Sequence, residues 1–316
     1  MESISITLNG REAVTLFLQP MVMIESVLQT FRIMPRLTTK KRLHFFGNLE
    51  GIIQKNTGCG WNAQGGVDIT SREIEPTRLK INLELCSDEF WDTIFEDALG
   101  VGLDIEKNPQ VLVALLIRRI NEAVAKDLYV LGWFGDKSSA NTFLNQLDGM
   151  FALIGDAIAS NLITEVDAGS GADLADGAAY GIFDELLNTA PLELRQLPDN
   201  LKVIKVTDTV YQNYVKYLES LGTESANRVL VDGIPRLTFR GILIENHPIW
   251  DSKFANAKTH CAVYSINQNF VCGLDTTSPE TELAIWEQMK EEMLYIKGKF
   301  KAGFNYVHEK YIAIAI

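Results

Sequence analysis

The chain has 316 residues, of which 47% are hydrophobic and 22% are charged, as is typical of a globular protein with a sizeable core. Its net charge of −12 argues against a dedicated nucleic-acid binder, because such proteins hold phosphates through Lys and Arg. The sequence contains no apolar run of the about 20 residues that span a bilayer. The first residues, MESISITLNGREAV, lack the pattern of a signal peptide, so we expect cytoplasmic synthesis and no membrane.

The N-terminal part combines an apolar segment with a basic one. Residues 1–30 contain the run VTLFLQPMVMIESVL, which Pro20 interrupts, so we expect an extended arm with a short helix rather than one long helix. From Ser26 to Leu49 every charged residue is basic. These residues are Arg32, Arg36, Lys40, Lys41 and Arg42.

Residues 41–86 have the pattern of a long β-hairpin. The first arm leads into TGCGWNAQGG, whose four glycines suit a loose end, and the return alternates Leu79, Ile81, Leu83 and Leu85 with polar residues. An arm of about 15 residues would reach roughly 50 Å. A compact domain of this length has a radius of gyration of only about 20 Å, so we expect neighbouring subunits to support the hairpin.

An acidic segment and a long helix follow the hairpin. Residues 87–106 carry seven acids and no base. From Gln110 to Leu131 apolar residues recur every three or four positions, which predicts an amphipathic helix of about six turns that begins after Asn108-Pro109. We expect Gly132 and Gly135 to end this helix.

The remainder alternates shorter helices and strands, which predicts an α+β fold. Helices are expected over 145–163, 183–189, 208–221 and 280–292. Strands are expected over 201–206, 228–231, 237–246, 261–266 and 270–274, with 297–304 and 306–314 as a closing pair. Residues 167–178 are expected to form a loop.

Residues that carry chemistry are dispersed. The four cysteines and four histidines form a single adjacent pair, His260-Cys261, which does not make a zinc site. Neither GCGWNAQGG nor AGSGAD fits a nucleotide-binding motif. His247 is a conceivable catalytic base, but no nucleophile stands beside it in the sequence. We therefore expect no catalytic residues, no metal and no cofactor.

Three segments in the second half resemble HK97-fold major capsid proteins of tailed bacteriophages. They are IPRLTFRGILIENHPIWD (Ile234–Asp251), AVYSINQNFVCGLD (Ala262–Asp275) and YIKGKFKAGFNYVHEKYIAIA (Tyr295–Ala315). The order of a long hairpin before a long helix is similar as well. The resemblance implies an HK97-like capsid fold with five parts. These are the N-arm (1–35), the extended hairpin or E-loop (41–86), the spine helix (about 109–131), the P-domain (87–178 and 276–316) and the A-domain (179–275).

The resemblance also implies a function. The chain would self-assemble through pentamers and hexamers into an icosahedral virion shell, made in the host cytoplasm, that encloses phage dsDNA without sequence-specific binding. Portal, scaffold and decoration proteins would be its partners. Two alternatives stay open: another shell, such as an encapsulin or a gene-transfer particle, and a cytosolic α+β enzyme with an unrecognised site.

Opposite blocks of charge predict an assembly interface. We expect the basic stretch Arg32–Arg42 of one subunit to meet the acidic residues 88–106 of a neighbour. Some family members crosslink an E-loop Lys to an Asn of a neighbour, and Lys55 has a suitable position, but nothing in the sequence supports the reaction and we expect none. The candidate interface residues are Arg32, Arg36, Lys40, Lys41, Arg42, Lys55, Trp61, Asp88, Glu89, Asp92, Glu96 and Asp97.

Overall fold

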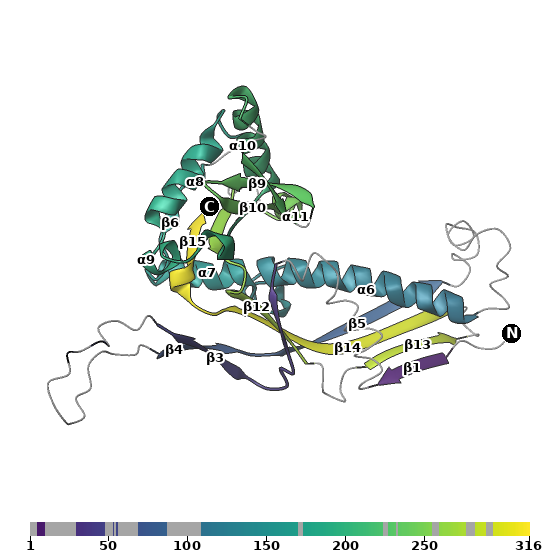
Figure 1. Cartoon of the computed structure of the whole chain (residues 1–316). Coiled ribbons are helices and arrows are strands. Elements are labelled where there is room, and N and C mark those ends of the chain that lie inside the picture. The colour runs from purple at the N-terminus through teal and green to yellow at the C-terminus, as the bar shows by residue number, and fades with distance from the viewer. Residues whose placement is uncertain are drawn as a thin grey trace. The chain divides into compact units, whose positions relative to one another are not determined.

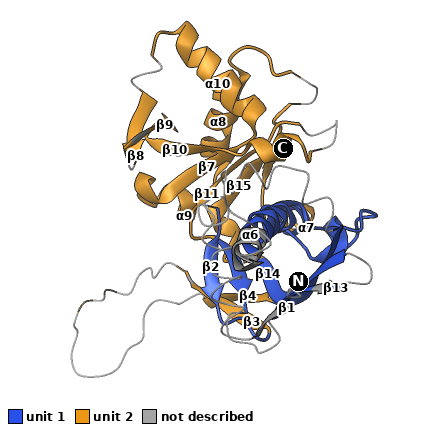
Figure 2. Cartoon of the chain, turned by 90° about the vertical axis from the view of Figure 1, so that its right-hand side faces the viewer, with its two compact units in different colours: residues 1–39, 75–156, 270–304 blue, residues 40–74, 157–269, 305–316 orange. Residues whose placement is uncertain are grey.

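A computed structural model gives the fold of the chain in two compact units. The residues that it describes are 5–9, 30–47, 53, 55, 69–86, 109–169, 173–223, 227–231, 233–254, 259–275, 282–288 and 293–316. Unit 1 comprises 1–39, 75–156 and 270–304, and unit 2 comprises 40–74, 157–269 and 305–316 (Figure 2). Each unit is built from segments that are distant in the sequence.

Unit 1 contains a six-stranded sheet in the order β1-β13-β14-β12-β2, with β5 also paired to β14. Its strands are β1 (Ser5–Asn9), β2 (Arg32–Pro35), β5 (Thr77–Cys86), β12 (Phe270–Leu274), β13 (Glu282–Gln288) and β14 (Met293–Tyr306). β14 pairs antiparallel with both β13 and β5, whereas β2 runs parallel to β12. The long strand β14 therefore joins most of the sheet.

The long helix α6 (Pro109–Phe134) runs beside β5 and β14 in the same unit (Figure 1). It confirms the helix predicted over 110–131. Gly132 does not end the helix as expected but lies within it, against Phe31 and Phe304. A Cβ on Gly132 would stand 2.7 Å from a ring carbon of Phe304, so glycine allows the helix to approach the aromatic core there. The last helical residue is Phe134, directly before Gly135.

After α6, unit 1 contains a single-turn helix η3 (Leu144–Gln146) and the helix α7 (Met150–Ala159), whose last residues belong to unit 2. The helix predicted over 145–163 is therefore shorter than expected. Gly149, just before α7, packs against the backbone of α6, where a Cβ would lie 2.6 Å from the carbonyl oxygen of Leu131. Only glycine allows this close approach, and α7 begins at the next residue, Met150.

Unit 2 contains a seven-stranded sheet in the order β6-β15-β11-β7-β10-β9-β8. Its strands are β6 (Glu165–Val166), β7 (Lys202–Val206), β8 (Arg228–Val231), β9 (Ile234–Phe239), β10 (Ile242–Asn246), β11 (Ala262–Ile266) and β15 (Ile312–Ala315). Its helices are α8 (Ala178–Thr189), α9 (Leu192–Arg195), η4 (Asp199–Leu201), α10 (Asp208–Ser220), α11 (Pro248–Asp251) and η6 (Glu309–Tyr311). Apolar residues of α8 and α10, including Phe183 and Tyr214, pack on the buried strand β7.

A separate antiparallel pair, β3 (Lys41–Phe46) with β4 (Ile69–Ile74), also belongs to unit 2. This pairing agrees with the hairpin predicted over 41–86, but the return strand does not continue along it. Residues 77–86 form β5 and pair with β14 instead. The change of partner follows Pro76, which lacks the N–H needed to continue a ladder.

Three other predicted elements near the C-terminus are wrong. Residues 282–288 form the strand β13 rather than a helix, because they pair with β1 on one side and β14 on the other. The strand expected over 237–246 is two strands, separated by Arg240 and Gly241, which both have positive φ (50° and 85°). The expected closing pair of strands does not form, since β15 pairs with β11 and β6.

Candidate functional site

The predicted basic stretch is divided between the two units. Arg32 and Arg36 are exposed in unit 1, at β2 and just after it, and Arg36 has a positive φ of 63°. Lys40, Lys41 and Arg42 are exposed in unit 2, at the start of β3. The five residues therefore do not form one surface within a single unit.

Two of these cations already have an acidic partner within the subunit. Lys40 Nζ lies 2.5 Å from a carboxylate oxygen of Glu73, and Arg42 Nε lies 3.3 Å from the other. Both hydrogen bonds lower the pKa of Glu73, and the one from Lys40 has the larger effect. All three side chains remain exposed, so each pair stabilises the fold only weakly, and part of the positive charge stays available to a partner.

Of the remaining predicted interface residues, only Lys55 is among the residues that the structure describes. Lys55 is exposed. Trp61 and the acidic residues lie outside the described residues, so the structure does not test their predicted role. The latter are Asp88, Glu89, Asp92, Glu96 and Asp97.

The base of the β3–β4 hairpin is fixed to the C-terminal residues of unit 2. The guanidinium carbon of Arg72 stands 3.9 Å from the centre of the Tyr306 ring, and its nitrogens lie 3.4 Å from Glu309. The ring of Phe45 stands 4.2 Å from that of His308, which is buried. Asn305 donates a 2.7 Å hydrogen bond to the carbonyl of Glu73. These contacts attach the hairpin base to unit 2, although most residues of β3 and β4 are exposed.

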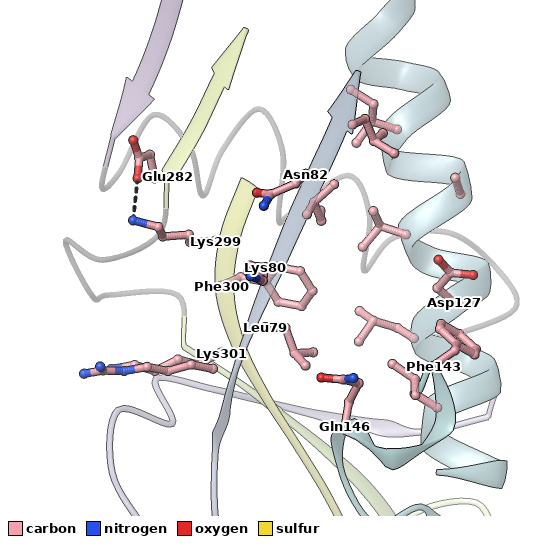
Figure 3. Close-up of a pocket in the computed structure, with 18 of the residues that line it drawn as sticks. Leu79, Lys80, Asn82, Asp127, Phe143, Gln146, Glu282, Lys299, Phe300 and Lys301 are labelled. Atoms are coloured by element: carbon pink, nitrogen blue, oxygen red, sulfur yellow. Dashed lines mark ion pairs between the residues drawn. The ribbon is translucent and has the colours of Figure 1, made fainter. Parts of the chain in front are cut away.

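Unit 1 contains a hollow of about 970 Å³ between the middle of α6 and the strand β5 (Figure 3). Leu79 and Phe300 point into it from the sheet, and its helix wall includes Val124 and Leu128. The apolar face of β5 is only partly covered, and 43% of Leu83 is exposed. The lining of the hollow is mixed, because polar and charged residues such as Lys80, Asp127 and Gln146 stand beside the apolar ones.

The strands β5 and β14 also present a basic face that the sequence did not reveal. Their register places Lys80 directly opposite Lys299 and Arg78 directly opposite Lys301. The only sequence signal was the alternation of basic and apolar residues within each strand, RLK and KGKFK. That pattern gives the face of each strand but not the pairing that joins them.

Unit 2 also contains a buried cluster of titratable side chains. Lys205, fully buried, forms an ion pair with Glu245, and His247 Nε2 lies 3.8 Å from the same carboxylate. Burial, helped by the charge of Lys205, holds the pKa of His247 well below its usual 6.5, so this histidine stays neutral. Asp251 accepts a 2.8 Å hydrogen bond from the backbone N–H of Asp208 at the start of α10. These groups position strands and helix ends.

Among the described residues, no group of three or more His, Cys, Asp or Glu side chains is arranged to hold a metal ion. None of the described helices combines the length and apolar character needed to cross a bilayer.

Comparison with known proteins identifies the fold. No protein-family model matches the sequence, and no curated protein matches it significantly. A chain of the satellite phage P4 procapsid has a TM-score of 0.61 at 12% identity, over 94% of this chain and 96% of that chain. A chain of the empty GTA particle capsid has a TM-score of 0.52 at 13% identity, over 92% and 88%. The native GTA capsid gives 0.51 at 12% identity, over 92% and 89%. The chain is therefore an α+β protein with the fold of HK97-type capsid proteins.

Proposed function

We propose that this chain is the major capsid protein of a tailed bacteriophage, which self-assembles through pentamers and hexamers into an icosahedral shell around phage dsDNA. The observation that carries the proposal is the fold likeness over nearly the whole chain to a protein of the P4 procapsid. The likeness spans 94% of this chain and 96% of the other, so the proposal gives the whole chain the role of a structural subunit rather than that of an enzyme.

The family layout gives each part of the chain a role in assembly. It comprises the N-arm (1–35), the E-loop (41–86), the spine helix (α6), the P-domain (87–178 and 276–316) and the A-domain (179–275). The long helix beside a sheet in unit 1 supports a P-domain there, and the hairpin β3–β4 supports an E-loop base, although residues 77–86 join the sheet of unit 1. The pairing of β15 with β11 departs from this layout, because it places the last strand in the sheet of the A-domain and not in the P-domain.

Assembly then depends on repeated contacts between unlike surfaces. Closed rings that are generated by rotation need heterologous interfaces, in which two different patches of the subunit match. A standard interface buries about 800 Å² on each partner. In the proposed layout the E-loop lies over one neighbour, the N-arm reaches along another, and the A-domain faces the five- and six-fold axes. Portal, scaffold and decoration proteins complete the virion, and the net charge of −12 suits a wall that does not grip its DNA.

The E-loop gives the first test. We predict that deletion of residues 57–66 leaves a folded subunit with an unchanged circular dichroism spectrum but abolishes shells in negative-stain microscopy. The reason is that the deleted residues lie beyond the packed base of the hairpin, which Arg72 and Phe45 hold to unit 2. If the deletion instead unfolds the subunit, the hairpin end belongs to the core and the proposed role is wrong.

The opposite charge blocks give the second test. We propose that Arg32–Arg42 of one subunit meets the acidic residues 88–106 of another, chiefly to fix register and specificity. Changing Lys40, Lys41 and Arg42 together to Glu is expected to lower the yield of shells, with a smaller effect at high salt. Glu73→Gln is the matched control, because it removes the partner of Lys40 and Arg42 within the subunit and leaves the cations intact. Normal particles from the triple variant would contradict the proposed pairing.

The shell of a gene-transfer particle is the second candidate, favoured by the likeness to GTA capsid chains at a TM-score of 0.52. The packaged nucleic acid distinguishes the two. A phage capsid is expected to contain copies of one genome, whereas a transfer particle would contain assorted fragments of the host chromosome. Sequencing the DNA of purified particles decides between them.

A further inference from the structure

One face of the sheet in unit 1 gathers five cations on two neighbouring strands. Residues directly opposite one another in an antiparallel pair lie on the same face, as do alternate residues along each strand. The register pairs Arg78 with Lys301, Lys80 with Lys299 and Asn82 with Lys297. We call the surface formed by Arg78, Lys80, Lys297, Lys299 and Lys301 the basic face.

The labelled side chains of this basic face point away from α6, although Arg78, Lys80, Lys299 and Lys301 are also among the residues that line the hollow. Leu79 and Phe300, which alternate with the cations, point toward α6, whereas Lys299 and Lys301 point away from it (Figure 3). Arg78 and Lys80 are exposed, and 49% of the Lys299 side chain is accessible. Arg78, Lys80 and Lys299 can therefore reach a partner, whereas only 14% of the Lys301 side chain is accessible.

The arrangement is unfavourable within the subunit alone. Like charges directly opposite each other destabilise an antiparallel pair, and two such pairs are adjacent here. Compensation is partial. Glu282 lies 3.2 Å from Lys299 and 3.5 Å from Lys297, and Asp275 lies 3.7 Å from Lys301. Among the described residues, none of the ion pairs of this face involves Lys80, so the centre of the face keeps positive charge.

We propose that the basic face binds an acidic surface of a second copy of this chain, and that residues 88–106, which are also proposed to meet Arg32–Arg42, supply acids to both contacts. This inference rests on the proposed function, because it requires subunits that associate. The argument is charge complementarity, since the block 88–106 contains seven acids and no base against the five cations. The alternative polyanion, DNA, fits less well, because a chain of net charge −12 repels it and Glu282 stands within the face.

The variant Lys80→Glu separates assembly from folding. It places an acid opposite Lys299, so the unassembled subunit should melt at the same temperature or higher. Shell yield should fall at least about tenfold at low salt, because an acid then faces the acidic block of the neighbour. Yield of the wild-type shells should itself fall in about 1 M NaCl, where charges more than about 3 Å apart are screened. Lys126→Glu, an exposed position on α6 outside the face, is the matched control and should assemble normally.

A charge swap tests the named partner. Shells lost in Lys80→Glu/Lys299→Glu should return when Asp92→Lys and Glu96→Lys are added to the same chain. Normal shells from Lys80→Glu would overturn the inference and leave the proposed function intact.

A lower melting temperature of the unassembled Lys80→Glu subunit would also overturn the inference, because the acidic partners of Lys80 would then lie within the same subunit. Normal shells with less DNA would assign the face to nucleic acid instead. If the wild-type chain forms no shells at all, the proposed function fails together with the inference.

Discussion

Lys205 shows how unit 2 accommodates charge in its interior. Its side chain is fully buried in the central strand β7 and is paired with Glu245 on the parallel neighbour β10. Removal of a lysine from water is costly and is offset only by a close partner with good geometry. The buried charge also acts on His247, which stacks on Trp250 with ring centres 4.8 Å apart. Protonation of His247 would place a second positive charge beside Lys205, which is unfavourable. We therefore expect acid pH to lower the stability of unit 2.

We predict that His247→Phe reduces the loss of stability at acid pH. The unfolded chain binds a proton at this histidine below about pH 6.5, whereas the folded protein, in which the pKa of His247 is lowered, does not. Stability therefore falls as the pH decreases from about 6.5, and a neutral phenyl ring removes this contribution. Urea unfolding of the subunit between about pH 7.5 and pH 5 measures it. An equally steep pH dependence in the variant would contradict the account, although some remains because burial also lowers the pKa of His308.

At the scale of elements, the helices and strands whose apolar pattern repeats could be predicted from the sequence. The strands that depend on a partner distant in the sequence could not. The helix Pro109–Phe134 was predictable because its apolar spacing recurs over many turns. The strand Glu282–Gln288 was not, because its adjacent apolar residues suit either periodicity and its pairing with Ser5–Asn9 decides. The basic face was missed for the same reason, since the partners of Arg78 and Lys80 lie near the C-terminus.

Gly303 in β14 gives a prediction about how the sheet meets its connections. A Cβ at this position would overlap sterically with the carbonyl oxygen of Glu75, which lies between β4 and β5 in the chain. Gly303→Ala should therefore destabilise the subunit by about 1–3 kcal/mol through overpacking against backbone. Gly155→Ala is the matched control, because nothing lies within 4 Å of its Cβ and the residue is in the helix α7.

The control substitution Gly155→Ala should change stability in the opposite direction and stabilise the subunit by about 0.5–1 kcal/mol, since alanine has a higher helix propensity than glycine. Chemical denaturation of both variants measures the difference. Equal effects of the two substitutions would mean that β14 can move away from Glu75 without loss.

At the scale of the whole molecule, charge is distributed unevenly over a chain of net charge −12. Five cations meet on one sheet face of unit 1, and seven acids occupy residues 88–106 without a base. An uneven distribution of this kind suits a subunit that pairs unlike surfaces with its neighbours. The fold of HK97-type capsid proteins provides the frame in which such pairs repeat around a shell.

The most direct test of the central claim is the size and shape of what the purified chain forms. Size-exclusion chromatography with negative-stain microscopy measures both. If the chain is a capsid protein, we expect closed shells of uniform diameter that elute in the megadalton range. Five- and six-fold clusters of subunits should be visible in averaged images. A small soluble oligomer whose melting temperature rises with a small-molecule ligand would contradict it.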